Sequence, residues 1–156
     1  MSRSVNVFLP MRAGSERVPQ KNTKVFSGIE GGLCRIKLEQ LLKCELIETI
    51  FVSTNDPQVV KIAKTFNSKK IKVVLRPNEL ASSSASTDKL INYVPEIMPD
   101  GHILWTHVTS PFISPDIYCQ IIDTYFKNLD RFDSLMTVTK IKKFIWNDLG
   151  PVNYDR

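Results

Sequence analysis

Short apolar runs alternate with helix-like stretches along most of the chain. The runs predict five strands, at residues 5–9, 49–53, 71–75, 103–108 and 134–139. Between them, apolar side chains recur at helical spacing in three groups: Leu38, Leu41 and Leu42; Val59, Ala63 and Phe66; and Ile117, Ile121, Tyr125, Phe126 and Leu129. Tight Asn-Gly or Asp-Gly hairpins do not join consecutive runs, which favours βαβ units. The predicted fold class is α/β, Rossmann-like, with three αβα layers and a mostly parallel sheet.

Two helix starts are well marked. Ser114 is a suitable N-cap, Pro115 fits the first helical position, and Asp116 suits the positive end of a helix. Asp56 and Pro57 form a second start of the same kind. The serine-rich stretch at residues 81–87 reads equally as a flexible loop that ends in a helix cap or as a ligand contact.

Length and composition describe an ordinary globular domain. The chain has 156 residues, 42% of them hydrophobic and 24% charged, which is typical of one domain with a real core. The net charge of +5 favours anionic ligands but is too small to indicate nucleic acid. Neither a membrane span nor a signal peptide is visible, and Cys34, Cys44 and Cys119 fit buried, reduced thiols. We therefore expect a cytoplasmic protein with no membrane or nucleic-acid partner.

The loop at residues 9–24 follows the first predicted strand and is rich in cations. It contains Arg12, Arg17, Lys21 and Lys24 together with Gly14, Ser15 and one acid, Glu16. Glycine lets backbone N–H groups approach an anion, and Arg and Lys supply charge, so the loop is a candidate phosphate cradle. A solvated basic turn is the alternative on composition alone. The spacing matches neither a P-loop nor G-x-G-x-x-G.

Two further polar loops also follow strands, at residues 76–82 and 107–111. Because parallel strands end at one edge of a sheet, the three loops are expected to converge on one site. His102 and His107 are predicted on opposite faces of a strand, with His102 structural and His107 a strand-end residue or a ligand contact. Trp105 and Trp146 are predicted core or interface anchors.

Three ordered motifs resemble the CMP-sialic acid synthetase family, the acylneuraminate cytidylyltransferases. The pattern R-x-x-S-x-x-x-P-x-K-N is matched by Arg12, Ser15, Pro19, Lys21 and Asn22. The other two are the stretch Arg-Pro-Asn-Glu-Leu-Ala at 76–81 and Thr-Ser-Pro at 109–111. The resemblance runs from about residue 5 to the end of the chain. It implies a single domain over residues 1–156, corresponding to about the N-terminal two-thirds of the family's nucleotide-diphospho-sugar transferase domain.

The resemblance implies transfer of a cytidylyl group from CTP to an acidic 2-keto sugar with release of pyrophosphate, for surface glycan synthesis. It implies catalytic roles for Arg12 and Lys21. It also implies a CTP site and a sugar site, formed respectively by Arg12, Ala13, Gly14, Ser15, Lys21, Asn22, Arg76 and Ser82, and by His107, Thr109 and Ser110. Magnesium and a homodimer are implied for the complete enzyme.

The chain departs from the family pattern in two places. His107 and Val108 replace glutamine and proline, so neuraminic, legionaminic, pseudaminic and the eight-carbon acid Kdo all remain open as acceptors. The family's Asp-x-Asp magnesium motif is expected beyond the end of this chain, and no metal ligand is assigned because Glu16 and Glu79 are not spaced as a pair. Residues 144–154 read as an excursion from the sheet, which suggests a fragment of a longer protein.

Two other functions compete with this reading. One is a truncated, inactive module that binds CTP without turnover. The other is a polyanion or RNA binder using residues 12–24, which is weaker because the basic cluster is short and carries no aromatic residues.

Overall fold

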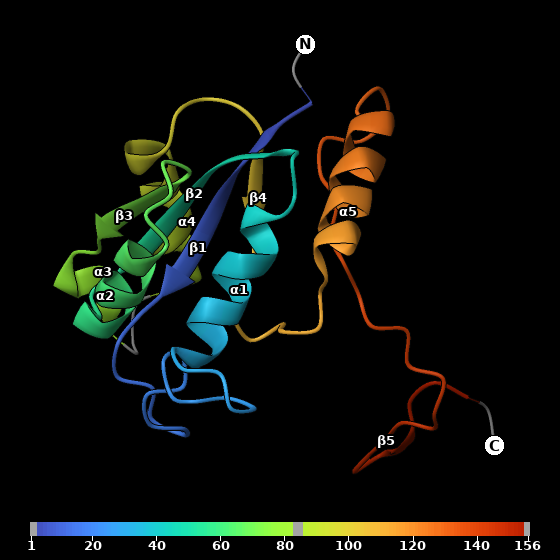
Figure 1. The fold of residues 1–156 in the computed structure, drawn as a ribbon. Coiled ribbons are helices and arrows are strands. Elements are labelled where there is room, and N and C mark those ends of the chain that lie inside the picture. Colours follow the sequence, from blue (N-terminus) through green and yellow to red (C-terminus); the bar gives the residue numbers. More distant parts are fainter. Residues whose placement is uncertain (1–2, 83–85, 155–156) are drawn as a thin grey trace.

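The computed structural model describes residues 3–82 and 86–154, and its centre is a four-stranded parallel sheet (Figure 1). The strand order is β3-β2-β1-β4. The strands are β1 (Val5–Met11), β2 (Ile47–Thr54), β3 (Ile71–Leu75) and β4 (Ile103–Trp105). All three pairings are parallel, so the predicted α/β class with a parallel sheet is confirmed.

Five helices connect and cover the strands. They are α1 (Gly32–Leu42), α2 (Pro57–Thr65), α3 (Asn78–Ala81), α4 (Thr87–Ile97) and α5 (Pro115–Lys127). Both predicted helix starts are confirmed, because the Asp56 side chain accepts from the Gln58 amide and Ser114 accepts from the Ile117 amide. Ser86 caps α4 in the same way, as one reading of the serine-rich stretch expected. Residues 83–85 of that stretch lie outside the described residues.

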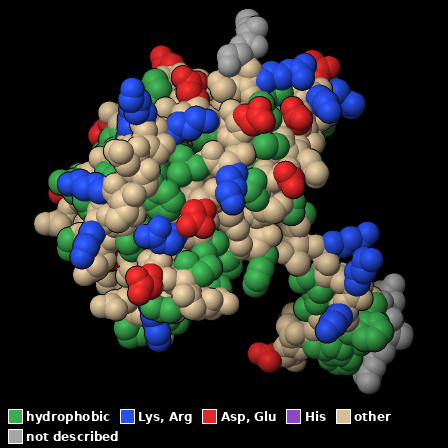
Figure 2. All heavy atoms as spheres, viewed as in Figure 1, with side chains coloured by type: hydrophobic (Ala, Val, Ile, Leu, Met, Phe, Trp, Pro, Cys, Tyr) green, Lys and Arg blue, Asp and Glu red, His purple; other side chains and the backbone are tan. Residues whose placement is uncertain are grey.

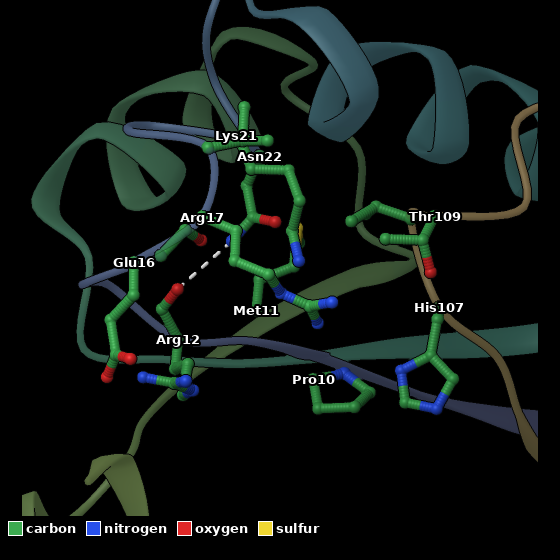
Figure 3. A pocket seen from close by; sticks show the side chains of 12 residues that line it. Pro10, Met11, Arg12, Glu16, Arg17, Lys21, Asn22, His107 and Thr109 are labelled. Atoms are coloured by element: carbon green, nitrogen blue, oxygen red, sulfur yellow. Dashed lines mark hydrogen bonds between the residues drawn. The ribbon is translucent and has the colours of Figure 1, made fainter. Parts of the chain in front are cut away.

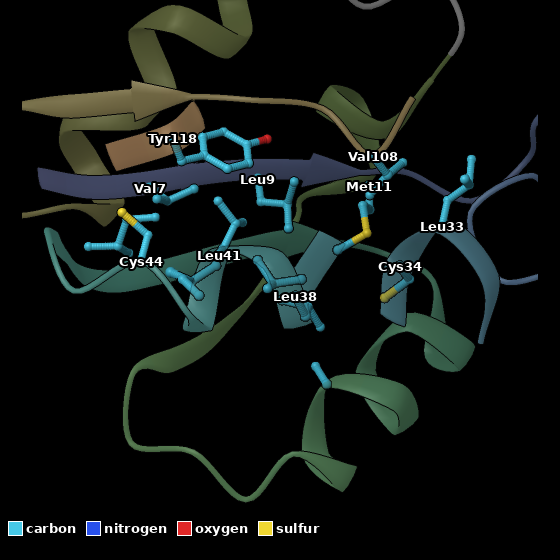
Figure 4. Packing of buried hydrophobic residues seen from close by; sticks show 14 of the residues in the cluster. Val7, Leu9, Met11, Leu33, Cys34, Leu38, Leu41, Cys44, Val108 and Tyr118 are labelled. Carbon is cyan, nitrogen blue, oxygen red and sulfur yellow. The ribbon is translucent and has the colours of Figure 1, made fainter. Parts of the chain in front are cut away.

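Two apolar layers fill the space on either side of the sheet, which gives the predicted αβα sandwich. Val7, Leu9 and Met11 of β1 face α1, α2 and α5 (Figure 4). The alternate side chain Phe8 faces α4, where it packs with Phe51, Val94 and Met98. Both faces of β1 and β2 are therefore buried, as expected for central strands of a parallel sheet.

Three expectations from the sequence are wrong or shifted. Residues 134–139 do not form a strand; they are exposed over their whole length, and no ladder pairs them within the described chain. β4 ends at Trp105 rather than at residue 108. The buried side of α5 is displaced from the predicted one, since Ile117 is 41% exposed whereas Tyr118 and Ile122 are buried.

After α5 the chain leaves the sheet as an extended arm, residues 128–154. The arm carries a small antiparallel hairpin, β5 (Trp146–Asn147) with β6 (Gly150–Pro151), so the expected excursion is observed. Figure 2 shows hydrophobic and lysine side chains gathered on a lobe set apart from the body. Trp146 is 52% exposed on this arm, whereas Trp105 packs edge-on against Phe8 in the α4 layer.

The join between the basic loop and α1 depends on one glycine. Gly32 has φ of +50°, and a Cβ at this position would overlap the Lys24 carbonyl oxygen. Only glycine meets both conditions without strain. Across the described residues, none of the helices has the length and apolar character that crossing a membrane requires.

Candidate functional site

The carboxyl ends of the four parallel strands gather at one edge of the sheet, and the polar loops lie there (Figure 1). Residues 12–22 follow β1, residues 76–82 follow β3, and residues 106–111 follow β4. Cavities at this edge are lined jointly by side chains from these loops. The structure therefore brings together the three loops that the sequence singled out.

Arg12 is the central residue of the site, because it lines three adjoining cavities. The largest, of about 610 Å³, is bounded by the basic loop and by residues 107–109 after β4. A second, of about 230 Å³, lies between Arg12 and the loop that carries Arg76 and Ser82. The third, of about 320 Å³, is enclosed by the basic loop itself and Asp56. One guanidinium thus borders all three spaces in which parts of a ligand could lie.

The largest cavity has a strongly basic wall (Figure 3). Arg12, Arg17 and Lys21 line it, with Glu16 as the acidic side chain among its lining residues. Ser15 and Asn22 complete the same wall. An excess of cations in a concave site attracts anions and is suited to phosphate groups.

Hydrogen bonds from two sides fix the backbone of the basic loop. The buried Asn22 donates from Nδ2 to the Arg12 carbonyl oxygen at 3.0 Å (Figure 3). The Ala13 amide donates to Asn55 Oδ1 at 2.8 Å. Gly14 follows with φ of +72°, and the Arg12 guanidinium donates to its carbonyl at 3.3 Å. The loop is consequently shaped before any ligand arrives.

Arg76 is buried rather than extended into solvent. Its guanidinium donates to the Ser53 hydroxyl at 3.1 Å and to the Ser53 carbonyl at 2.8 Å. Burial lowers the pKa of Arg76; the nearby Tyr93 opposes this shift and the charge of Arg12 adds to it. Arg76 and Ser82 both line the 230 Å³ cavity.

His107 lies between two of the cavities, since it lines both the 610 Å³ and the 230 Å³ cavity. Its Nε2 accepts a hydrogen bond from Trp105 Nε1 at 3.1 Å. Burial, and then the charge of Lys21, lowers the pKa of His107, which favours the neutral ring. With Nε2 occupied as an acceptor, the neutral ring carries its proton on Nδ1 and can donate it to a ligand.

His102 has a different environment. Its Nδ1 pairs with the Tyr125 hydroxyl at 2.9 Å, and its ring meets Phe126 edge-on. This agrees with the structural role predicted for His102.

The Thr-Ser-Pro loop contributes unequally. Thr109 lines the largest cavity beside His107. Ser110 instead directs its carbonyl oxygen inward, where it accepts from Lys37 Nζ at 2.8 Å.

Asn55 supports the site from below the basic loop, and the sequence analysis missed it. It follows β2 just as the other loops follow their strands, and it holds the Ala13 amide. Its position after a buried strand was the available signal.

The described residues form no ready-made cluster of metal ligands. Within ranges 3–82 and 86–154, no three His, Cys, Asp or Glu side chains come together in a group able to hold a metal ion. Glu16 borders the 610 Å³ cavity and Asp56 the 320 Å³ cavity, so these acids lie in the linings of different cavities.

Comparison with known proteins gives a family match and several distant relatives. A family model described as cytidylyltransferase matches residues 7–148. The pseudaminic acid cytidylyltransferase of Campylobacter jejuni is 26% identical over 130 residues, covering 80% of this chain and 54% of that protein. The N-acylneuraminate cytidylyltransferase of Escherichia coli is 26% identical over 144 residues, covering 92% of this chain and 33% of that protein. The chain thus spans about half the length of the first relative and a third of the second.

Solved structures share the fold at lower identity. A CMP:2-keto-3-deoxy-manno-octonic acid synthetase complexed with CTP superposes with a TM-score of 0.62 at 20% identity, over 81% of this chain and 48% of that one. The 4-diphosphocytidyl-2C-methyl-D-erythritol synthase of Anaerococcus prevotii gives 0.64 at 16% identity, over 97% and 63%.

Proposed function

Because the chain belongs to the cytidylyltransferase family, we propose that it transfers a cytidylyl group from CTP to an acidic 2-keto sugar and releases pyrophosphate. The observation that carries the proposal is the position of Arg12, which borders a basic cavity, a second cavity beside Arg76, and a third within its own loop. A nucleoside triphosphate needs adjoining spaces of this kind, one for phosphates and one for the nucleoside.

In this proposal the basic loop binds the triphosphate. Arg12 and Lys21 hold the β- and γ-phosphates and neutralise the charge that develops on leaving pyrophosphate. Ser15 and the Gly14 amide add donors around the same phosphates, whereas the Ala13 amide is bonded to Asn55 and shapes the loop. Arg76 and Ser82 contact the cytidine half in the smaller cavity.

The acceptor lies against the turn after β4. Its hydroxyl attacks the α-phosphorus in line with the departing pyrophosphate, so the work of the site is orientation and charge stabilisation. His107 donates from Nδ1 to the acceptor and Thr109 lines the same wall, whereas Ser110 supports this wall through the bond between its carbonyl and Lys37. The names of the curated relatives favour an acid of the sialic or pseudaminic type, with Kdo as the eight-carbon alternative and a homodimer as the expected assembly.

A thermal-shift panel with CTP, CDP, UTP, ATP and GTP tests the donor. A ligand at 100 times its Kd stabilises the native state by about 2.7 kcal/mol, so a selective response to CTP is readily seen. Equal responses to all five nucleotides would contradict the proposal and favour a general polyanion site.

Arg12→Ala and Lys21→Ala test the phosphate contacts, with Lys61→Ala as a charge-matched control on the exposed side of α2. Loss of one phosphate cation is expected to cost about 2–4 kcal/mol of transition-state stabilisation, which is roughly 30- to 1000-fold in pyrophosphate release. Wild-type rates in both variants would refute the assignment. CTP binding without pyrophosphate release, across a panel of neuraminic, pseudaminic, legionaminic and Kdo acceptors, would identify a binding module.

A further inference from the structure

Lys37, on the inner face of α1, is a lysine with no exposed surface. Its Nζ donates to the Ser110 carbonyl oxygen at 2.8 Å and to the Tyr118 hydroxyl at 2.7 Å. Burial lowers the pKa of Lys37 to about 8, which is the signature of a charged group held where charge is unfavourable. An apolar side chain of similar length would fill this space at a lower free-energy cost.

Gln40, three residues later on the same face of α1, is also a polar side chain whose burial is unfavourable. It donates from Nε2 to the Pro111 carbonyl oxygen at 2.6 Å. Its Oε1 is buried and has no hydrogen-bond partner among the described residues, and such an acceptor is destabilising. Two polar side chains on one helix face therefore both donate to consecutive carbonyls of one loop.

The same network also reaches the beginning of that loop. The Tyr118 hydroxyl pairs with Thr106 Oγ1 at 2.8 Å, so Lys37 is linked through Tyr118 to the residue directly after β4. The loop between these anchors is a turn, in which the Ser110 amide donates to the His107 carbonyl at 3.4 Å. Side chains of α1 and α5 therefore hold residues 106, 110 and 111 through hydrogen bonds.

We propose that Lys37 and Gln40 are positioning residues, which fix the turn at residues 106–111 so that His107 and Thr109 stay at the wall of the 610 Å³ cavity. They touch neither donor nor acceptor. They act on the wall formed by His107 and Thr109, which lies across the cavity from the basic loop. The functional part of the inference rests on the proposed transfer reaction.

Lys37→Met separates positioning from simple packing. Methionine keeps most of the side-chain length but removes the donors, while the Ser110 carbonyl keeps its bond from the Ile113 amide and the Tyr118 hydroxyl keeps its bond with Thr106. Lys70→Met is the matched control, because Lys70 Nζ also donates to a backbone carbonyl, that of Ile47.

The first measurement is hydrogen exchange of the backbone amides of residues 107–110, 112 and 113 in the ligand-free protein. Exchange is expected to be at least tenfold faster in Lys37→Met and unchanged in Lys70→Met, because local opening no longer has to break the Lys37 bonds. The urea midpoint of Lys37→Met at pH 7 is expected to equal or exceed that of the wild type. Unchanged exchange in Lys37→Met would overturn the proposal.

The second measurement compares the KM of the acceptor sugar with the Kd of CTP. Lys37→Met is expected to raise the KM of the best acceptor in the panel at least tenfold while the Kd of CTP stays within threefold. Equal losses of stability, CTP binding and acceptor use would show a merely structural lysine. If the wild-type chain performs no transfer, the proposed function fails, but the exchange measurement still decides the positioning role. Gln40→Met, which removes the Pro111 bond alone, gives the same two readouts should Lys37→Met not fold.

Discussion

Asn22 offers the sharpest test of how the basic loop is built. Its side chain is buried and its Nδ2 donates to the Arg12 carbonyl at 3.0 Å, while its own carbonyl accepts from the Cys34 amide at 2.8 Å. Asn22→Ala removes the first bond and leaves the second, which is between backbone atoms. The Arg12 carbonyl then lacks this partner in a partly buried position, and such a loss costs about 1–3 kcal/mol.

Urea denaturation of the ligand-free protein measures this cost. With an m-value of about 1–3 kcal/mol/M for a small protein, a loss of about 2 kcal/mol lowers the midpoint by roughly 1 M. Asn128→Ala is the control, since Asn128 Nδ2 also donates to a backbone carbonyl, that of Thr124 at 2.7 Å, but in an exposed setting. Water replaces that bond, so the control is expected to stay within about 0.5 kcal/mol of the wild type.

The result that would refute this reasoning is specific. If Asn22→Ala retained wild-type stability without ligand and yet lost its response to CTP, Asn22 would act by touching the nucleotide. Its hydrogen bond to the Arg12 carbonyl would then contribute little to the shape of the loop.

Two further predictions concern backbone strain and pH. Gly28→Ala is expected to lower the free energy of unfolding by about 1–2 kcal/mol for its positive φ alone, because a Cβ there meets nothing within 4 Å. Gly32→Ala also overlaps the Lys24 carbonyl and is expected to lower it by more than about 3 kcal/mol, as measured by urea denaturation. Equal losses in the two variants would contradict the close approach at Gly32. Because the pKa of His107 lies below the ordinary 6.5 in the folded state, the unfolded chain binds more protons near that pH, so the urea midpoint is expected to fall as pH is lowered from 7.5 to 5.5. His107→Gln is expected to weaken this dependence, and an unchanged pH profile in that variant would place its origin elsewhere.

The sequence predicted the sheet well where apolar runs are long and continuous. β3 has the predicted bounds, and β1 and β2 extend the predicted strands by one to two residues at their ends. It failed at residues 134–139, where β-branched and apolar residues suggested a strand but no described segment pairs with them. Local propensity cannot supply a neighbouring strand.

For helix α4 the sequence suggested the cap but not the helix that follows it. Its apolar residues do recur at helical spacing, since Leu90, Val94 and Ile97 all pack in the cluster around Phe8, but Pro95 interrupts the segment and counts against a helix there. In α5 the buried side includes Tyr118, whose hydroxyl finds Lys37 and Thr106 in the interior. A prediction of the buried face that counts only apolar residues therefore misses a tyrosine that is buried because its hydroxyl has polar partners.

The convergence of the three loops was predictable from the order of strands and loops alone. Parallel strands bring their carboxyl ends to one edge, so loops that follow strands converge whatever their detailed conformation. Asn55 and Lys37 escaped because a single amide and a single lysine produce no periodicity. Their roles are visible only once Ala13 and Ser110 are seen beside them.

Helix α1 spans from the basic loop to the turn after β4. Near its first turn the Cys34 amide holds the Asn22 carbonyl, and further along Lys37 and Gln40 hold Ser110 and Pro111. The two walls of the largest cavity are therefore both hydrogen-bonded to helix α1. The distance between them depends on where Cys34, Lys37 and Gln40 lie along that helix. A ligand that enters this cavity therefore meets two walls that are both fastened to α1.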